Sequence, residues 1–452
     1  MIRLADRKDC CGCGACAAVC PHDAIAMVPD GMGFRYPRVD TDRCVDCHLC
    51  EDTCSFADSA AEASGCKTAL RCAPGPSRTS GSPHPAGCDV LPLDFVGPPG
   101  DICPDGAWPR VATGFAPTAS SAASASDTPV SGESANSRHA RPDRASVIAE
   151  AIRFPELMDR SQSGGLAFAL MRKAIRSGMV VYGAAIDDDF VVRHRRVETE
   201  EGLEPLRLSK YVQSECDPAM VLEDLKAGRR VLFTGTPCQC AGVGSLCRKY
   251  REGLLLADIL CHGVPAPFVW RDYLAEQERR HGKKLTRVLF RDPALGWHEH
   301  KEVLFFGDER VVGGEYTDLF YRHLMLRPSC TVCPYASVAR VSDLTMADCW
   351  GVEKALPGFA GDNRGCSLLL CNTPAGEAFS ADFPGETVER RAVALEKVMQ
   401  ANSLAPSTPK DGADLFENTY IRRGYSVAER RCRRNAIRIR VRRWARKAGI
   451  KL

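Results

Sequence analysis

The stretch CCGCGACAAVCP at residues 10–21, with CVDCHLCEDTC at residues 44–54, decides how the first part of the chain folds. Both stretches contain the spacing C-x2-C-x2-C-x3-C, whose members are Cys10, Cys13, Cys16, Cys20, Cys44, Cys47, Cys50 and Cys54. Two runs with this spacing are the ligand set of a ferredoxin that carries two 4Fe-4S clusters. The sequence therefore predicts a module that transfers electrons.

The spacing also predicts which cysteines share a cluster. Three thiolates at every third position bind three irons of one cube, whereas the fourth lies too far along the chain and reaches the neighbouring cluster. Cys54 therefore completes the first set, and Cys20 completes the second. The alternative is a structural zinc module, which usually has two well-separated C-x2-C pairs around one ion. Two identical blocks of four favour the clusters. The additional thiol of Cys11 is interpreted as a bystander.

Length and composition indicate a globular protein with more than one domain. The 452 residues suffice for two or three domains, and a hydrophobic fraction of 44% can fill a sizeable core. The 24 cysteines would indicate disulfides in a small secreted chain, but this chain is long and they cluster at metal-ligand spacing. We see no signal peptide and no run approaching the roughly 20 apolar residues that span a bilayer. We therefore expect a cytoplasmic protein of a reducing, anaerobic cell.

The charge is distributed unevenly along the chain. Residues 421–452 contain 13 Lys or Arg and one acidic residue, a balance of +12, so the total of +3 leaves 3 − 12 = −9 for the rest. We interpret the basic tail as a solvated terminal helix, and the alternative is contact with an anionic membrane surface or an acidic partner. No base-reading motif accompanies the tail, which argues against binding of nucleic acid.

Composition divides the chain into four parts. We expect a small α+β two-cluster ferredoxin domain at residues 1–56, and a disordered low-complexity insert at 57–144, where Pro, Gly, Ser and Ala dominate. Residues 145–390 are expected to form a large domain, and residues 391–452 a C-terminal helical region with the basic tail. A further metal site in the insert is a weaker alternative, because the gaps between its thiols are irregular. These thiols are Cys66, Cys72, Cys88 and Cys103.

The large domain alternates helical and strand patterns. Amphipathic segments at 165–177 and 217–227 predict helices, and apolar segments at 179–186, 230–233 and 254–260 predict buried strands. This alternation is typical of an α/β domain with a mixed, substantially parallel sheet. Polar or cysteine-bearing turns follow the strands, so we expect a site at one edge of the sheet.

Three turns carry residues that could bind a ligand or take part in a reaction. The backbone amides of 161–165, ahead of a helix, would favour a phosphate, although two glycines before a helix are more often a plain turn. The turn 235–239 places Cys238 at a helix start, where the macrodipole stabilises a thiolate, and the alternative is a small buried cysteine. The C-x2-C pair of 330–333 is in isolation a zinc half-site or a redox dithiol.

From residue 161 to residue 383 the chain resembles the beta subunits of coenzyme F-420 hydrogenases and dehydrogenases. The matching motifs, in order, are SGG, SKYVQS, LFTGTPCQ, LCHGVP, FRDPALGW, RPSCTVCP, DLTMADCWG and GCSLLLCNT. The bacterial branch of this family similarly joins a two-cluster ferredoxin to the large domain. The resemblance covers residues 4–56 and 145–383, and it misses the insert and the tail.

The resemblance implies a bound flavin, usually FAD, and a third 4Fe-4S cluster in the large domain. The implied cluster ligands are Cys238, Cys261, Cys330 and Cys333. The thiols held in reserve are Cys240, Cys247, Cys366 and Cys371. The implied flavin-binding positions are Ser163, Gly164, Gly165, Lys210, Gly235, Thr236 and Gln239. Cys349 stands where the family often has an aromatic residue, so we interpret it as a substitution.

The resulting hypothesis is an iron-sulfur flavoprotein oxidoreductase that exchanges electrons with a redox partner protein or a ferredoxin. Coenzyme F-420 or another two-electron acceptor is the expected substrate. One alternative is a non-catalytic electron-transfer subunit that docks a partner reductase, and another is a transferase with Cys238 as nucleophile. Side chains that could contact flavin or substrate, but for which a structural role is favoured, are His262, His298, His300, Arg291 and Asp292.

Overall fold

The computed structural model describes all residues except 3, 5, 57–147, 399–405, 408–411 and 436–452. The insert expected at 57–144, with its four cysteines, lies outside the described residues. So does the part of the basic tail beyond residue 435. Helix α12 and the helical residues 425–435 end the described chain.

The N-terminal module consists of two similar halves around a hairpin. Each half contains a one-turn helix that follows a residue in the left-handed conformation, Gly14 (φ 80°) before α1 and His48 (φ 62°) before α2. Strands β1 and β2 pair antiparallel, with Ile25 opposite Val39. The elements are η1 (Arg7–Asp9), α1 (Ala15–Ala18), β1 (Ile25–Pro29), β2 (Arg35–Val39) and α2 (Leu49–Asp52).

The large domain is built on an eight-stranded mixed sheet with the order β13-β3-β12-β11-β7-β6-β4-β5. The four neighbours β11, β7, β6 and β4 are parallel, and the outer strands join antiparallel. The predicted fold class is therefore confirmed. The strands are β3 (Ile148–Arg153), β4 (Val180–Ile186), β5 (Val192–Val197), β6 (Val231–Gly235), β7 (Leu254–Ile259), β11 (Leu344–Asp348), β12 (Ser367–Cys371) and β13 (Glu389–Ala392).

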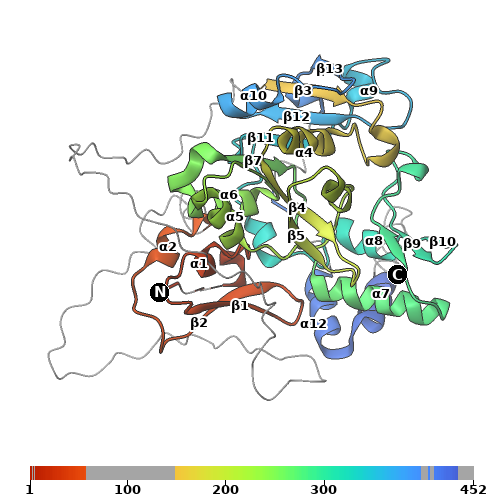
Figure 1. The fold of residues 1–452 in the computed structure, drawn as a ribbon. Coiled ribbons are helices and arrows are strands. Elements are labelled where there is room, and N and C mark those ends of the chain that lie inside the picture. Colours follow the sequence, from red (N-terminus) through yellow and green to blue (C-terminus); the bar gives the residue numbers. More distant parts are fainter. Residues whose placement is uncertain (3, 5, 57–147, 399–405, 408–411, 436–452) are drawn as a thin grey trace, which may run out of the picture.

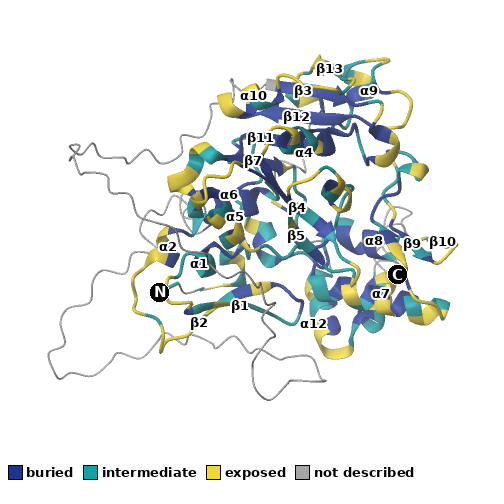
Figure 2. Ribbon diagram, in the orientation of Figure 1, coloured by how far each residue is buried: buried dark blue, intermediate teal, exposed yellow. Residues whose placement is uncertain are grey.

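Helices cover both faces of the parallel strands, which is why these strands are mostly apolar (Figure 2). Alternate residues of β4 face opposite ways: Val181 packs with helix α4, whereas Val180 packs with helices α5 and α6. The helices are α4 (Leu166–Arg176), α5 (Pro218–Lys226) and α6 (Pro237–Leu246). The first two confirm the helices predicted at 165–177 and 217–227.

A second, three-stranded sheet, β10-β9-β8, was not anticipated from the sequence. Its members are β8 (Arg287–Leu289), β9 (Val303–Phe306) and β10 (Glu309–Val312), beside α7 (Pro267–His281), α8 (Glu315–Tyr321) and α12 (Ala413–Arg423). The remaining elements are η3 (Met158–Arg160), η4 (Glu201–Leu206), η5 (Arg248–Gly253), η6 (Pro293–Leu295), η7 (Pro328–Val332), α9 (Val352–Ala355), α10 (Pro374–Ser380) and α11 (Leu395–Val398). Among the helices in the described ranges, none is long and apolar enough to cross a membrane.

The N-terminal module is packed firmly against the large domain (Figure 1). Met32, Phe34 and Tyr36 belong to the same hydrophobic cluster as residues of α7, α8 and α12. The backbone N–H of Phe268 donates to the carbonyl of Met32 at 3.1 Å. Gly33 has φ 89°, and a Cβ there would lie 2.8 Å from the Phe268 ring. The shared core fixes the position of the module relative to the large sheet.

Candidate functional site

Four thiols of the N-terminal module line one small cavity. They are Cys20, Cys44, Cys47 and Cys50. Cys20 comes from the first cysteine run and the other three come from the second. Backbone amides point at the sulfurs, since the N–H of Ala24 lies 3.4 Å from the Cys20 Sγ and that of Ile2 lies 3.3 Å from the Cys50 Sγ. Such N–H···S contacts are typical of the surroundings of iron-sulfur clusters.

A second set of thiols lies closer to the large domain. It consists of Cys10, Cys13, Cys16 and Cys54. Burial raises the pKa of Cys16, and the charges of Cys13, Cys10 and Cys54 raise it further. The four thiols are therefore close enough to interact electrostatically. The N–H of Gly12 lies 3.3 Å from the Cys10 Sγ. Helices α1 and α2 contact each other, so the two sets of the module are adjacent.

A third set of thiols converges in the large domain. Cys238 lies in the first turn of α6, Cys261 follows β7, and Cys330 and Cys333 lie in and just after η7. Burial raises the pKa of Cys261 well above its usual value, and the charges of Cys330, Cys238 and Cys333 add to the effect. Because β6 and β7 are parallel neighbours, their carboxyl ends bring Cys238 and Cys261 together.

A buried ion pair holds the loop that follows the third set. The Nη2 of Arg340 lies 2.9 Å from the Oδ1 of Asp258 on β7, and both side chains are almost completely buried. Arg340 also donates to the carbonyl of Tyr335 at 3.1 Å, two residues beyond Cys333. Asp258 is the one charged residue of the apolar strand β7, and this pairing accounts for it.

The three sets have the composition that 4Fe-4S clusters require, four thiolates each. In the described part of the chain, no three His, Cys, Asp or Glu side chains meet closely enough to hold a single metal ion. A zinc site needs four ligands around one centre, whereas each thiolate of a 4Fe-4S cube binds a separate iron.

The reserve thiols lie in hydrophobic packing. Cys240 and Cys247 are fully buried among apolar side chains of α5, α6 and the sheet, and Cys366 and Cys371 are buried in strand packing. Cys349 is fully buried and contacts Cys366. These surroundings suit the ordinary role of a buried cysteine as a small apolar residue.

Cys11 lies between the second and third sets. It is 5% exposed, and its thiol is within hydrogen-bonding reach of both Cys13 and Cys238. The hydrogen bond between Cys11 and Cys238, and to a smaller extent that between the Thr236 hydroxyl and Cys238, lower the pKa of Cys238 to about 7. A Cβ on Gly242 of α6 would lie only 2.6 Å from the Cys13 Sγ. The sequence interpretation of Cys11 as a bystander missed this position between two sets.

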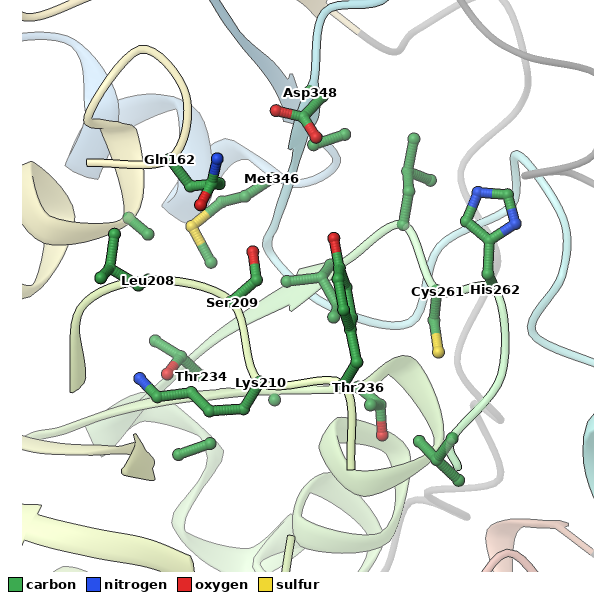
Figure 3. A pocket seen from close by; sticks show the side chains of 18 of the residues that line it. Gln162, Leu208, Ser209, Lys210, Thr234, Thr236, Cys261, His262, Met346 and Asp348 are labelled. Atoms are coloured by element: carbon green, nitrogen blue, oxygen red, sulfur yellow. The ribbon is translucent and has the colours of Figure 1, made fainter. Parts of the chain in front are cut away.

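A cavity of about 790 Å³ opens at the carboxyl ends of β6, β7 and β11. Its size is within the range of cofactor sites. Figure 3 shows Lys210, Thr236, Cys261 and Asp348 around it, from four different segments. Cys238 and Cys261 of the third set contribute to its wall. A cavity thus lies at the sheet edge where the sequence predicts a site.

Six of the seven predicted flavin-binding positions line this cavity: Ser163, Gly165, Lys210, Gly235, Thr236 and Gln239. Gly164 is absent from the described lining. A Cβ at Gly164 would lie 2.3 Å from the Ile152 carbonyl oxygen and 2.6 Å from the Ser367 nitrogen, so this glycine allows the loop to approach β3 and β12. Its role is packing against the sheet rather than contact with the cavity.

Two half-buried basic side chains in the cavity wall, Lys210 and His194, have different hydrogen-bond partners. The Lys210 Nζ donates to the Arg207 carbonyl at 2.5 Å, and burial lowers its pKa to about 7. His194 Nε2 donates to the Thr234 carbonyl at 2.9 Å, and the Ser214 hydroxyl donates to Nδ1 at 3.0 Å. Burial lowers the pKa of His194 to about 4, so this ring is neutral. Lys210 is therefore the group in this pair that can present a positive charge.

The other candidate contacts divide between the cavity and the framework. His262 and His300 line the cavity. Arg291 is held in an ion pair with Asp348 at 2.7 Å and Asp292 in one with Arg310 at 2.8 Å, and the His298 Nε2 lies 3.0 Å from the Glu353 Oε1. The sequence interpretation missed Trp350, which lines the cavity and stacks on Trp297 with ring centroids 4.5 Å apart.

Two known protein families match this chain, one in the large domain and one in the N-terminal module. Residues 228–393 match the family described as the C terminus of the Coenzyme F420 hydrogenase/dehydrogenase beta subunit. Residues 9–57 match the 4Fe-4S dicluster domain. The predicted resemblance is confirmed: a match to the beta-subunit family in the large domain follows a match to an iron-sulfur domain in the N-terminal module.

Two curated relatives share short segments with the chain. The B subunit of the Na(+)-translocating ferredoxin:NAD(+) oxidoreductase complex of Acetobacterium woodii is 44% identical over 48 residues, 11% of this chain and 13% of the relative. The iron-sulfur A subunit of the CoB–CoM heterodisulfide reductase of Methanocaldococcus jannaschii is 37% identical over 65 residues, 12% of this chain and 10% of the relative. The chain thus matches only a small part of either relative's length.

A chain of the F420-reducing NiFe hydrogenase complex from Methanosarcina barkeri, solved after xenon derivatization, is similar at 18% identity with a TM-score of 0.40. The similarity covers 63% of this chain and 90% of that chain. At this TM-score the likeness adds nothing to the sequence matches.

Proposed function

We propose that this protein is an iron-sulfur flavoprotein oxidoreductase. In the proposal, single electrons pass between the module's two clusters and a third cluster in the beta-subunit domain, beside a flavin in the 790 Å³ cavity. The observation that carries the proposal is the position of Cys238. It belongs to the third thiol set, lines the cavity, and contacts Cys11 next to Cys13.

The described residues support binding of FAD in the cavity. Helix α4 begins beside Ser163 and Gly165, and its free N–H groups would favour the pyrophosphate. Thr236 and Gln239 form a capping box that holds the start of α6, the helix that carries Cys238. Lys210 offers a cation to an anionic group of the cofactor. Bound flavin would supply the exchange between single electrons and electron pairs.

Cofactor content tests the proposal. Protein purified without oxygen is expected to contain about 12 irons per chain, four for each of three clusters, with equal sulfide and one flavin. Iron and acid-labile sulfide are measured by colorimetry, and flavin by absorbance after release. About 8 irons without flavin would contradict the proposal and favour the alternative, a non-catalytic electron-transfer subunit that docks a partner reductase.

Coenzyme F-420 is proposed as the two-electron substrate because residues 228–393 match a family described by that coenzyme. Reduced ferredoxin serves as the electron donor in the assay. The expected result is loss of the deazaflavin absorbance when protein is added. An unchanged deazaflavin band, with the protein's own flavin reduced, would exclude F-420 and indicate another acceptor.

Flavin affinity is expected to depend on the charge of Lys210. The pKa of Lys210 is lowered to about 7 by burial, so the cation is present below pH 7 and is lost as the pH rises. An anionic cofactor favours the charged form, and affinity should therefore be highest below pH 7 and fall above it. Fluorescence titration of flavin-depleted protein at pH 6 to 9 measures this. Lys210→Met should bind about tenfold more weakly at pH 6.

The charge-retaining variant provides the control for this profile. Lys210→Arg keeps a cation throughout the range, so its flavin affinity should not fall above pH 7. Lys210→Met should also give a flat profile, at lower affinity. If the methionine variant reproduces the wild-type pH dependence, another group is responsible.

A further inference from the structure

Arg327 is completely buried at the junction between the module and the beta-subunit domain. It directly precedes η7, which contains Cys330. Its guanidinium reaches across the junction, where Nε donates to the Cys10 carbonyl at 2.8 Å and Nη2 to the Arg35 carbonyl at 2.9 Å. Nη1 donates to the Gln213 Oε1 at 2.9 Å. One residue thus joins the second and third thiol sets.

The charge of Arg327 has no carboxylate partner among the described residues. Its hydrogen-bond acceptors are two carbonyls and an amide, and the fourth contact is the Cys10 Sγ, 3.7 Å from Nη2. The Tyr36 ring lies 4.3 Å from the guanidinium carbon. Burial of a cation is costly unless a negative charge compensates it. A thiolate-bound cluster at Cys10 would supply that negative charge.

We propose that Arg327 is a positioning residue that raises the reduction potential of the cluster held by the second thiol set. The inference rests on the proposed function insofar as a cluster occupies that set. Reduction adds a negative charge to a cluster, and a fixed cation nearby stabilises the reduced form. A hydrogen bond toward the Cys10 sulfur acts in the same direction. Arg327 therefore makes this cluster a better electron acceptor than it would be without the buried cation.

Anaerobic redox titration followed by EPR spectroscopy tests the proposal. At the wild-type midpoint of this cluster, Arg327→Met should lower the ratio of reduced to oxidised cluster at least tenfold, which is about 59 mV for one electron. Arg327→Lys keeps the charge and should remain within about threefold of wild type. The midpoints of the other two clusters should not change.

Arg7→Met is the matched control. Arg7 crosses the same junction to Glu417 of α12 at 2.5 Å, and it lies 5.9 Å from the Tyr36 ring. Its charge is compensated by Glu417 and by Asp30 at 2.6 Å. Loss of Arg7 should weaken the packing of the N-terminal module against the large domain without changing the reduction midpoint of any cluster. Equal shifts in Arg7→Met and Arg327→Met would overturn the proposal, as would wild-type midpoints in an iron-replete Arg327→Met protein.

A second pair of variants covers the case in which Arg327→Met does not bind its full iron. Arg327→Gln and Arg327→Lys both lose the guanidinium fork, but only lysine keeps the charge. The glutamine variant should have the lower midpoint, and equal midpoints would overturn the proposal. The iron and flavin content of the wild type distinguishes a failure of this proposal from a failure of the proposed function. With about 8 irons and no flavin the proposed function fails, while the shift at the second set remains measurable.

Discussion

Replacing Gly242 by alanine is expected to reduce the iron content from about 12 to about 8 per chain. The added Cβ would lie 2.6 Å from the Cys13 Sγ and 2.8 Å from the Cys13 Cβ. A cluster-bound sulfur cannot move away without breaking its bond to iron, so the cluster of the second set should be lost. Alanine in the middle of a helix is otherwise favourable by about 1 kcal/mol relative to glycine. Iron and sulfide analysis with EPR of the reduced protein measures the loss.

Gly244→Ala is the control on the same helix. Its Cβ would meet only the Leu256 Cδ1, at 3.2 Å, and that side chain can adjust. This variant should bind the wild-type amount of iron. If Gly242→Ala also does so, the close approach of α6 to Cys13 is not required for cluster binding.

Replacing Cys261 by serine is expected to remove the third cluster and to leave the two clusters of the module and the flavin. Cys261 is electrostatically coupled to the three other thiols of its set, and serine at neutral pH does not supply a thiolate. Iron should fall from about 12 to about 8 per chain with flavin unchanged. Reduction of the flavin through the module should become at least about a hundredfold slower, a barrier increase of about 2.7 kcal/mol, in stopped-flow absorbance.

Cys240→Ser separates a ligand from a buried thiol. Cys240 lies on α6 two residues after Cys238, but its sulfur faces the Ala257 carbonyl at 3.8 Å within the hydrophobic core. Its iron content and flavin reduction should match wild type. If Cys261→Ser keeps its full iron content, or if Cys240→Ser loses iron, the reserve thiols rather than the predicted set bind the third cluster.

Much of the fold was predictable because the signals are local. Apolar runs predicted β4, β6 and β7, and amphipathic patterns predicted α4 and α5. The short strands β8, β9 and β10 carry too few residues to show a period, and their pairing was not predicted. At the site, Gly164 is a predicted flavin-binding position that is not among the described residues lining the cavity, and its lack of a side chain allows the close approach to β3 and β12.

The sequence by itself determined the cluster type of the module, because the distance between cysteines a few residues apart is set by the local chain. It also determined that strand ends would deliver polar turns to one edge of the sheet. Only the tertiary structure placed Cys11 between two thiol sets and Arg327 against Cys10, a residue 317 positions away. Contacts over such separations depend on strand order and on the core shared by the two domains, which no local pattern encodes.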